Sequence, residues 1–171
     1  MILVEADVDG EWDSRIDWRS IANKAARAAI AHSHHAMLAD SSVQAELSVK
    51  FTTDAELREL NAAWRDKDKA TNVLSFPMLD GDTLFALDVA DVGEILLGDV
   101  ALAAGVCAAE AGDRGIAVES HAAHLVAHGV LHLLGYDHET GPEDAEVMEA
   151  TERAALASIG IADPYQAEVR S

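Results

Sequence analysis

The chain has 171 residues, half of them apolar, which is enough to bury the core of one domain. Its formal net charge of −19 at neutral pH excludes a protein that coats nucleic acid through a uniformly basic surface. A single cysteine excludes an internal disulfide, and no stretch approaches the roughly twenty apolar residues that a membrane span needs.

The amino-terminal half predicts two strands and two helices. Residues 1–8 alternate enough for a strand, and residues 18–38 carry apolar side chains at helical spacing. Residues 43–51 alternate apolar and polar side chains, which is typical of a half-buried strand. Thr53 and Glu56 have the spacing of a capping box, which predicts a second helix that begins there.

The carboxy-terminal half predicts two further strands and then two long helices. The strands are expected over residues 71–77 and 95–102, and the helices over residues 118–134 and 142–158. Strands grouped early and helices late predict an α+β fold. We expect one domain over residues 1–171, with a small mixed sheet of about four strands covered by helices and a metal site on a late helix.

The start of the chain and its cysteine both indicate a cytoplasmic protein. Glu5 and Asp7 follow the first residues at once and no basic segment precedes them, unlike a secretory signal. Cys107 lies among alanines, where a buried and unreactive thiol is expected. One cysteine also suits a reducing compartment.

Three histidines lie in an otherwise apolar stretch, "HGVLHLLGYDH", which runs from His128 to His138. His128 and His132 are four positions apart on a helical pattern, so both imidazoles leave the same face. Gly135 stands where a helix commonly ends in a left-handed turn, after which the chain can return His138 to the same point. Three nitrogen ligands leave the fourth position on zinc open, which predicts a catalytic metal site.

Neighbouring polar residues are candidates for supporting roles. His124 lies one turn before His128 and is expected to orient the ligands or to pack, because a fourth ligand would close the open position. Asp137 adjoins a predicted ligand and either orients it or forms a turn. The histidines of residues 32–35 suit the end of a helix and are weaker metal candidates. One zinc per chain is the preferred cofactor, and three-histidine sites also accept nickel and other divalent ions.

One position departs from the zinc-protease pattern H-E-x-x-H-x-x-G-x-x-H. Where that pattern has its glutamate general base, this chain has Gly129. A peptidase that activates water with this carboxylate is therefore not expected. Another zinc metallohydrolase, with a displaced base, stays open as an alternative.

At these residues the sequence resembles the YbeY family, bacterial metal-dependent endoribonucleases of ribosomal RNA maturation. The histidine stretch resembles the family signature, and residues 60–77 resemble the family segment L-N-x-x-[YW]-R-x-x-[DN]-x-x-T-[ND]-V-L-S-F-P. A third block, "LGDVALA" at residues 97–103, resembles the family strand L-G-D-[IV]-x-[IL]-[SA]. The blocks occur in family order, and the resemblance covers roughly residues 40–160.

The resemblance implies zinc held by His128, His132 and His138 in a single α+β domain that cleaves single-stranded RNA. It also implies ribosomal RNA processing, notably at the 3′ end of the small-subunit 16S RNA, and a part in ribosome quality control. The implied partners are single-stranded ribosomal RNA and the ribosome or ribosome-associated proteins, with no membrane and no DNA expected. Arg65 matches the family's functionally important arginine, and a guanidinium beside a metal suits the charge that develops on a phosphoryl group.

Basic residues gather in one short region of this acidic chain. We expect them to line an RNA groove beside the metal, with Arg65 also catalytic: Arg58, Arg65, Lys67 and Lys69. The acidic remainder would then suppress non-specific RNA binding. An alternative from another class is a ribosome-assembly factor whose zinc is mainly structural, so that metal removal unfolds it.

Overall fold

One mixed sheet organises the molecule. The computed structural model describes residues 1–40, 43–79, 93–137 and 141–165. Its strands are β1 (Ile2–Val8), β2 (Gln44–Thr52), β3 (Val73–Pro77) and β4 (Glu94–Ala103). Its helices are α1 (Trp18–Ala31), the short 3-10 helix η1 (Ala36–Ala39), α2 (Asp54–Arg65), α4 (Ala104–Arg114), α5 (Val118–Leu133) and α6 (Pro142–Ser158).

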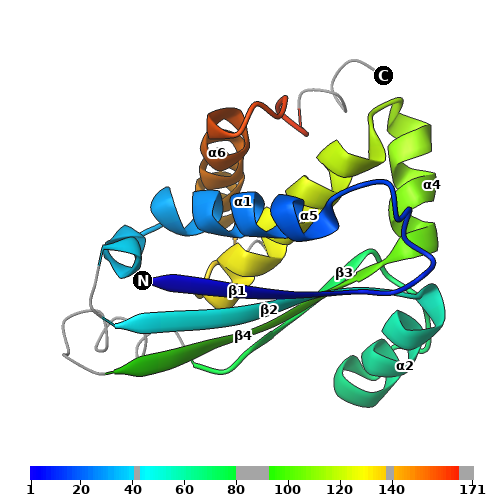
Figure 1. Ribbon diagram of the computed structural model, residues 1–171, viewed down its shortest axis with the longest axis horizontal. Coiled ribbons are helices and arrows are strands. Elements are labelled where there is room, and N and C mark those ends of the chain that lie inside the picture. The colour runs from blue at the N-terminus through cyan, green and yellow to red at the C-terminus, as the bar shows by residue number, and fades with distance from the viewer. Residues whose placement is uncertain (41–42, 80–92, 138–140, 166–171) are drawn as a thin grey trace.

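The strands lie in the order β1-β2-β4-β3. β1, β2 and β4 run parallel, whereas β3 pairs antiparallel with β4 at one edge of the sheet. Helices α1, α5 and α6 lie on one face, and α2 lies on the other (Figure 1). The expected α+β fold, a small mixed sheet covered by helices with the histidines on a late helix, is confirmed.

Burial follows the sequence pattern most clearly in β2, which has a neighbouring strand on each side. Ala45, Leu47, Val49 and Phe51 are all buried and belong to the main hydrophobic core. Because successive side chains of a strand point to opposite faces, this alternation directs one whole face of β2 into that core. The strand predicted over residues 43–51 is thus confirmed, shifted by one position.

Gly98 lets β3 approach β4 closely. Its φ is 139°, and a β-carbon there would lie 2.3 Å from the carbonyl oxygen of Phe76. The register between β2 and β4 also shifts next to this point, between Glu46 and Leu47. Glycine is the residue that combines such a backbone conformation with so close a contact.

The first helix ends earlier than its sequence pattern predicts. Helical spacing continues through residue 38, but α1 stops at Ala31 and η1 follows separately. The hydroxyl of Ser33 donates to the carbonyl of Ile30, and the backbone N–H of His34 donates to the hydroxyl of Tyr136 at 2.9 Å. The predicted single helix was therefore wrong, because a contact distant in sequence fixes the chain just beyond α1.

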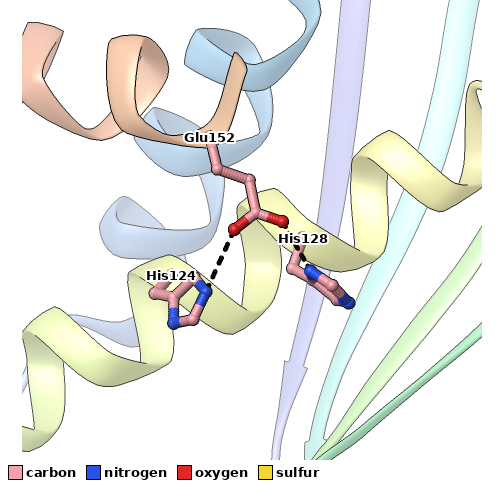
Figure 2. Close-up of side chains that lie close together, drawn as sticks. All are labelled: His124, His128 and Glu152. Carbon is pink, nitrogen blue, oxygen red and sulfur yellow. Dashed lines mark hydrogen bonds and ion pairs between the residues drawn. The ribbon is translucent and has the colours of Figure 1, made fainter. Parts of the chain in front are cut away.

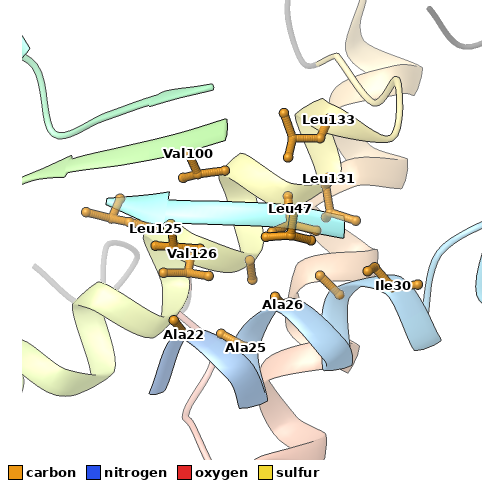
Figure 3. Packing of buried hydrophobic residues seen from close by; sticks show 14 of the residues in the cluster. Ala22, Ala25, Ala26, Ile30, Leu47, Val100, Leu125, Val126, Leu131 and Leu133 are labelled. Carbon is orange, nitrogen blue, oxygen red and sulfur yellow. The ribbon is translucent and has the colours of Figure 1, made fainter. Parts of the chain in front are cut away.

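Helix α5 packs against α1, α6 and the strands β3 and β4, and it is buried on nearly every side. The facing positions of α1 are alanines, among them Ala22, Ala25 and Ala26, and none of the three has exposed surface (Figure 3). Such small side chains allow the two helices to pack closely. Polar groups on a helix this buried need hydrogen-bonding partners within the protein.

Cys107 lies on the buried side of α4. Burial, reinforced by the nearby carboxylate of Glu110, raises the pKa of its thiol to about 12. The thiol therefore stays protonated at neutral pH, whereas the thiolate is the reactive form. The expectation of a buried cysteine is confirmed, and the raised pKa agrees with the low reactivity expected there.

None of the helices in the described part of the chain has the length and apolar character that crossing a membrane requires.

Candidate metal site and cleft

Two of the three predicted ligands face each other on α5. His128 and His132 stand one helical turn apart, and their Nε2 atoms are 3.2 Å from one another. The two rings meet nearly edge to face, with centroids 4.7 Å apart. Both side chains are half-buried, and both line a cleft at the surface.

Helix α5 ends at the predicted glycine. Gly135 has a φ of 95°, and its N–H donates to the carbonyl of His132 at 3.1 Å. The next N–H, of Tyr136, donates to the carbonyl of Leu131 at 3.0 Å. This pair of bonds is a Schellman motif, and it turns the chain back as the sequence predicted. His138, the third predicted ligand, lies outside the described residues.

Glu152 of α6 points between two histidines of α5 (Figure 2). One carboxylate oxygen lies 3.1 Å from Nε2 of His124, and the other lies 2.5 Å from Nδ1 of His128. The hydroxyl of Tyr165 donates to the same carboxylate. Glu152 is 0% exposed, so these partners take the place of water.

The carboxyl group of Glu152 is ionised at neutral pH. Its burial opposes ionisation, but hydrogen bonds from His124 and His128 outweigh that effect and lower its pKa to about 2. A buried carboxylate of this kind is stable only while its partners remain in place. Glu152 therefore ties the position of α6 to the histidines of α5.

The carboxylate also decides which ring nitrogens carry protons. Because Glu152 accepts hydrogen bonds, Nδ1 of His128 and Nε2 of His124 are the donating nitrogens. In neutral His128 the other nitrogen, Nε2, then presents a lone pair, and this is the atom that faces His132. A carboxylate that accepts a hydrogen bond from one imidazole nitrogen, while the other nitrogen binds the ion, is a common arrangement at metal sites.

The converging nitrogens fit a divalent metal ion. Two nitrogens bound to one tetrahedral zinc at ~2.0–2.1 Å lie ~3.3 Å apart. The 3.2 Å between the Nε2 atoms of His128 and His132 is close to that value. The donor set, neutral imidazole nitrogen, is the one that zinc and related ions accept.

His124, His128 and Glu152 form a second grouping that could hold a metal ion, with one ligand atom of each within 4.8 Å of the others. The two groupings share His128 and therefore compete for it. Glu152 is sealed from solvent and engaged with both histidines, whereas His128 and His132 line an open cleft. An ion that contacts a substrate must lie where the substrate can reach it. This requirement favours a site between His128 and His132 over one between His128 and Glu152.

The cleft beside the histidines has a volume of about 540 Å³. His128, His132 and Asp137 line it from α5 and the turn that follows. Arg65, at the end of α2, also lines it, together with Lys67 and Lys69 after the helix. The same cleft thus contains three predicted RNA-binding residues and two predicted ligands. Such a combination of basic side chains and metal-binding nitrogens suits a phosphate-bearing substrate.

A buried asparagine holds the basic wall of the cleft in place. The side-chain amide of Asn61 donates to the carbonyl of Lys69 at 2.9 Å, and its backbone carbonyl accepts from the N–H of Lys67. Between them the chain leaves α2 through Asp66, which adopts the left-handed conformation with a φ of 57°. These bonds position the segment after α2 and leave the lysine side chains to the cleft.

Arg58, the fourth predicted RNA-binding residue, is placed differently. Its guanidinium pairs with Asp68, with Nε 2.8 Å from the carboxylate, and both side chains are exposed. Arg58 does not belong to the residues that line the cleft. Its role in RNA binding stays a prediction.

Gly129 packs directly against the sheet. A β-carbon at this position would lie 2.7 Å from a methyl group of Val100 in β4. Val100 is buried and β-branched, so it has little freedom to move aside. The packing therefore leaves no room for the glutamate that a zinc protease carries at this point.

The histidines of residues 32–35 serve the end of α1. Nδ1 of His32 lies 2.9 Å from the carbonyl of Ala28, and the ring of His34 stacks at an angle on Tyr136. The first contact lies within the last turn of α1, and only the second joins the end of α1 to the turn after α5.

Glu152 and Asn61 were missed as supporting residues in the sequence. One signal for Glu152 was available, because it shares a helical face with Met148 and Leu156, both buried. A glutamate on an apolar face is rarely buried without a partner. Which histidines it meets depends on how α6 packs across α5, and the sequence pattern does not contain that information.

Known proteins resemble almost the whole length of this chain. The profile of the family described as Endoribonuclease YbeY matches residues 10–160. The endoribonuclease YbeY of Rhizorhabdus wittichii is 48% identical over 165 residues, covering 96% of this chain and 97% of that protein. The endoribonuclease YbeY of Novosphingobium aromaticivorans is 48% identical over 168 residues, with 97% of each chain covered.

A solved structure is similar in fold. The solution structure of TM1509 from Thermotoga maritima matches with a TM-score of 0.53 and 21% sequence identity, over 93% of this chain and 91% of that one. At this identity the likeness supports the fold alone. The family profile and the close relatives confirm the resemblance that three sequence blocks indicated. This chain belongs to the YbeY family of endoribonucleases.

Proposed function

We propose that this chain is a metal-dependent endoribonuclease that cleaves single-stranded ribosomal RNA, with residues 1–171 forming one catalytic domain. Its work is the maturation of ribosomal RNA, notably the 3′ end of the small-subunit RNA, and ribosome quality control in the cytoplasm. The ribosome or ribosome-associated proteins are its partners. Membership of the YbeY family supports the reaction, and the cleft supports an anionic substrate.

In this proposal His128, His132 and His138 hold one zinc ion, or nickel or another divalent ion in its place. The observation that carries the proposal is the 3.2 Å approach of two Nε2 atoms at the cleft, with Glu152 fixing His128 from behind. A bound divalent ion supplies Lewis-acid stabilisation of negative charge on phosphoryl oxygens. The part of His138 rests on sequence spacing.

The chain's own side chains bind and orient the RNA. Arg65 lines the same cleft as the histidines, and its planar guanidinium donates to the phosphoryl oxygens where negative charge grows during cleavage. Lys67 and Lys69 attract the neighbouring phosphates, and Arg58 adds a peripheral contact. His124 steadies Glu152, and Asp137 lines the cleft beside the ligands and orients them.

Gly129 argues against peptide hydrolysis on this scaffold. The contact with Val100 removes the space for a carboxylate between the two helical histidines. None of the described cleft residues other than Asp137 is acidic, whereas three are basic. The cleft thus favours a phosphodiester over a peptide.

The test is cleavage of a labelled single-stranded ribosomal RNA fragment by wild type and His132→Ala, purified in parallel. His132→Ala removes one donor at the cleft, so we expect cleavage to fall at least about a hundredfold, because metal-ligand loss disables the site. His32→Ala is the matched control, since it removes an exposed histidine at the far end of α1.

Thermal melts of all three proteins show whether each is folded. Cleavage that is equal in wild type and folded His132→Ala would contradict the proposal. A protein that binds ribosomal RNA without cutting it would favour the assembly-factor alternative.

A further inference from the structure

Trp64 is exposed to an unusual degree for its residue type. Its side chain is 72% exposed on α2, whereas Trp12 and Trp18 are 4% and 3% exposed in the core. Burial of an aromatic ring is a large source of stability, so a tryptophan left in water contributes little of it to the fold. The exposed indole is therefore available to bind a partner outside the chain.

Phe76 of β3 holds the ring of Trp64 at the surface. The two ring centroids are 6.5 Å apart and the rings are tilted by 66°, an edge-to-face arrangement. Phe76 is itself half-buried and packs against a small cluster beneath α2 that includes Leu57 and Leu74. One side of the indole is thereby supported, and most of its surface stays accessible.

This aromatic pair adjoins the cleft along the chain, on the α2 side of strand β3. Trp64 immediately precedes Arg65, which lines the cleft, and Phe76 lies between two cleft residues, Ser75 and Pro77. Lys67 and Lys69 follow on the same segment. Because β3 is the terminal strand of the sheet, a chain lying in the cleft can pass over its edge toward α2 (Figure 1).

We propose that Trp64, braced by Phe76, is a stacking platform for an unpaired base of the RNA strand held in the cleft. Single-strand binding sites combine cations that follow the phosphates with aromatic rings that stack on the bases. Arg65, Lys67 and Lys69 supply the first element, and Trp64 supplies the second. A base in a duplex is already stacked, so the platform also selects single strands. This inference rests on the proposed function and adds a base-binding subsite to it.

The test compares two oligonucleotides of equal length and charge. One is a fluorescein-labelled 2′-O-methyl oligoadenylate, and the other is a fully abasic strand with the same phosphates. Affinities for the metal-loaded protein come from fluorescence anisotropy, and a gel checks that each strand is intact afterwards. Loss of one base stack weakens binding by about tenfold. We expect Trp64→Leu to show that loss with the oligoadenylate and no change with the abasic strand.

Two further variants separate stacking from apolar contact. Trp64→Phe keeps a ring and should retain most of the affinity, whereas Met37→Ala removes an exposed apolar side chain on η1 and should change nothing. The salt dependence of binding should be the same in wild type and Trp64→Leu, because no phosphate contact is lost.

Equal affinity of wild type and Trp64→Leu for the oligoadenylate would overturn the inference. An equal loss on both strands would overturn it as well, since the ring would then not act on bases. If wild type binds and cuts RNA in these cases, the proposed function survives the loss of this subsite. If wild type binds neither strand, the proposed function fails and the inference fails with it.

Discussion

At the scale of single residues, Glu152 is the side chain that most sharply shapes the site. It has no exposed surface, and it accepts hydrogen bonds from His124 and His128 while its pKa is held near 2. Through Nδ1 it directs the other nitrogen of His128 toward His132. In the proposed metal site Glu152 would therefore act through His128, as a positioning residue.

Replacement of Glu152 by glutamine tests this role. Glutamine has nearly the same shape but no charge, so His128 loses a charged acceptor and becomes a weaker ligand. We expect metal affinity to fall about 10- to 100-fold, measured by competition with a coloured zinc chelator. Glu146→Gln on the exposed side of α6 is the control. Unchanged affinity in a folded Glu152→Gln protein would contradict the positioning role.

At the scale of elements, glycine positions set how closely α5 and β3 approach β4. Gly129 brings α5 against Val100, and Gly98 brings β3 against the same strand. These contacts fix the walls of the cleft, because His128 and His132 flank Gly129 on the helix. The packing against β4 therefore requires glycine at position 129. The same glycine means that the chain has no protease base at this position.

A β-carbon at Gly129 should destabilise the protein although alanine favours helices. The contact at 2.7 Å forces Val100 or the helix to move, which costs about 1–3 kcal/mol and outweighs the gain of about 1 kcal/mol in helix propensity. We expect a lower free energy of unfolding for Gly129→Ala in urea titrations. Gly112→Ala in α4 meets nothing within 4 Å, so it should be neutral or stabilising. Equal stability of the two variants would show that α5 is not constrained at this point.

Local patterns predicted most elements, and long-range contacts explain the exceptions. The cap at Thr53 forms as expected, with its hydroxyl 3.1 Å from the N–H of Glu56, and Gly135 ends α5 as expected. The helix over residues 18–38 was predicted too long because Tyr136, distant in sequence, fixes the chain after α1. The supporting role of Glu152 was not predicted for the same reason, since its partners lie on another helix.

At the scale of the whole molecule, one basic cleft lies on a strongly acidic protein. The net charge of −19 repels polyanions at long range, whereas Arg65, Lys67 and Lys69 line the same cleft as the histidines. Cationic residues away from this region are in part neutralised, as Arg15 is by Asp13. We expect this contrast to direct RNA to one approach beside the proposed site.

Charge reversal in the cleft tests this view. Lys67→Glu with Lys69→Glu removes two phosphate contacts, so RNA affinity should fall and the slope of log affinity against log salt should become shallower by about 1.4. The measurement is a set of binding titrations with single-stranded RNA at increasing salt concentrations. Lys24→Glu, an exposed charge reversal on α1, changes net charge at a distant point and should leave the slope unchanged. An unaltered slope in the double variant would place RNA elsewhere on the surface.

Reversible removal of the metal decides whether its role in this protein is catalytic or structural. The protein is stripped with a chelator, and metal content, circular dichroism and RNA cleavage are measured on the same samples before and after zinc is returned. We predict that the stripped protein keeps its folded spectrum, loses cleavage and regains it in proportion to bound metal. Unfolding on metal loss, or cleavage that persists without metal, would contradict the account.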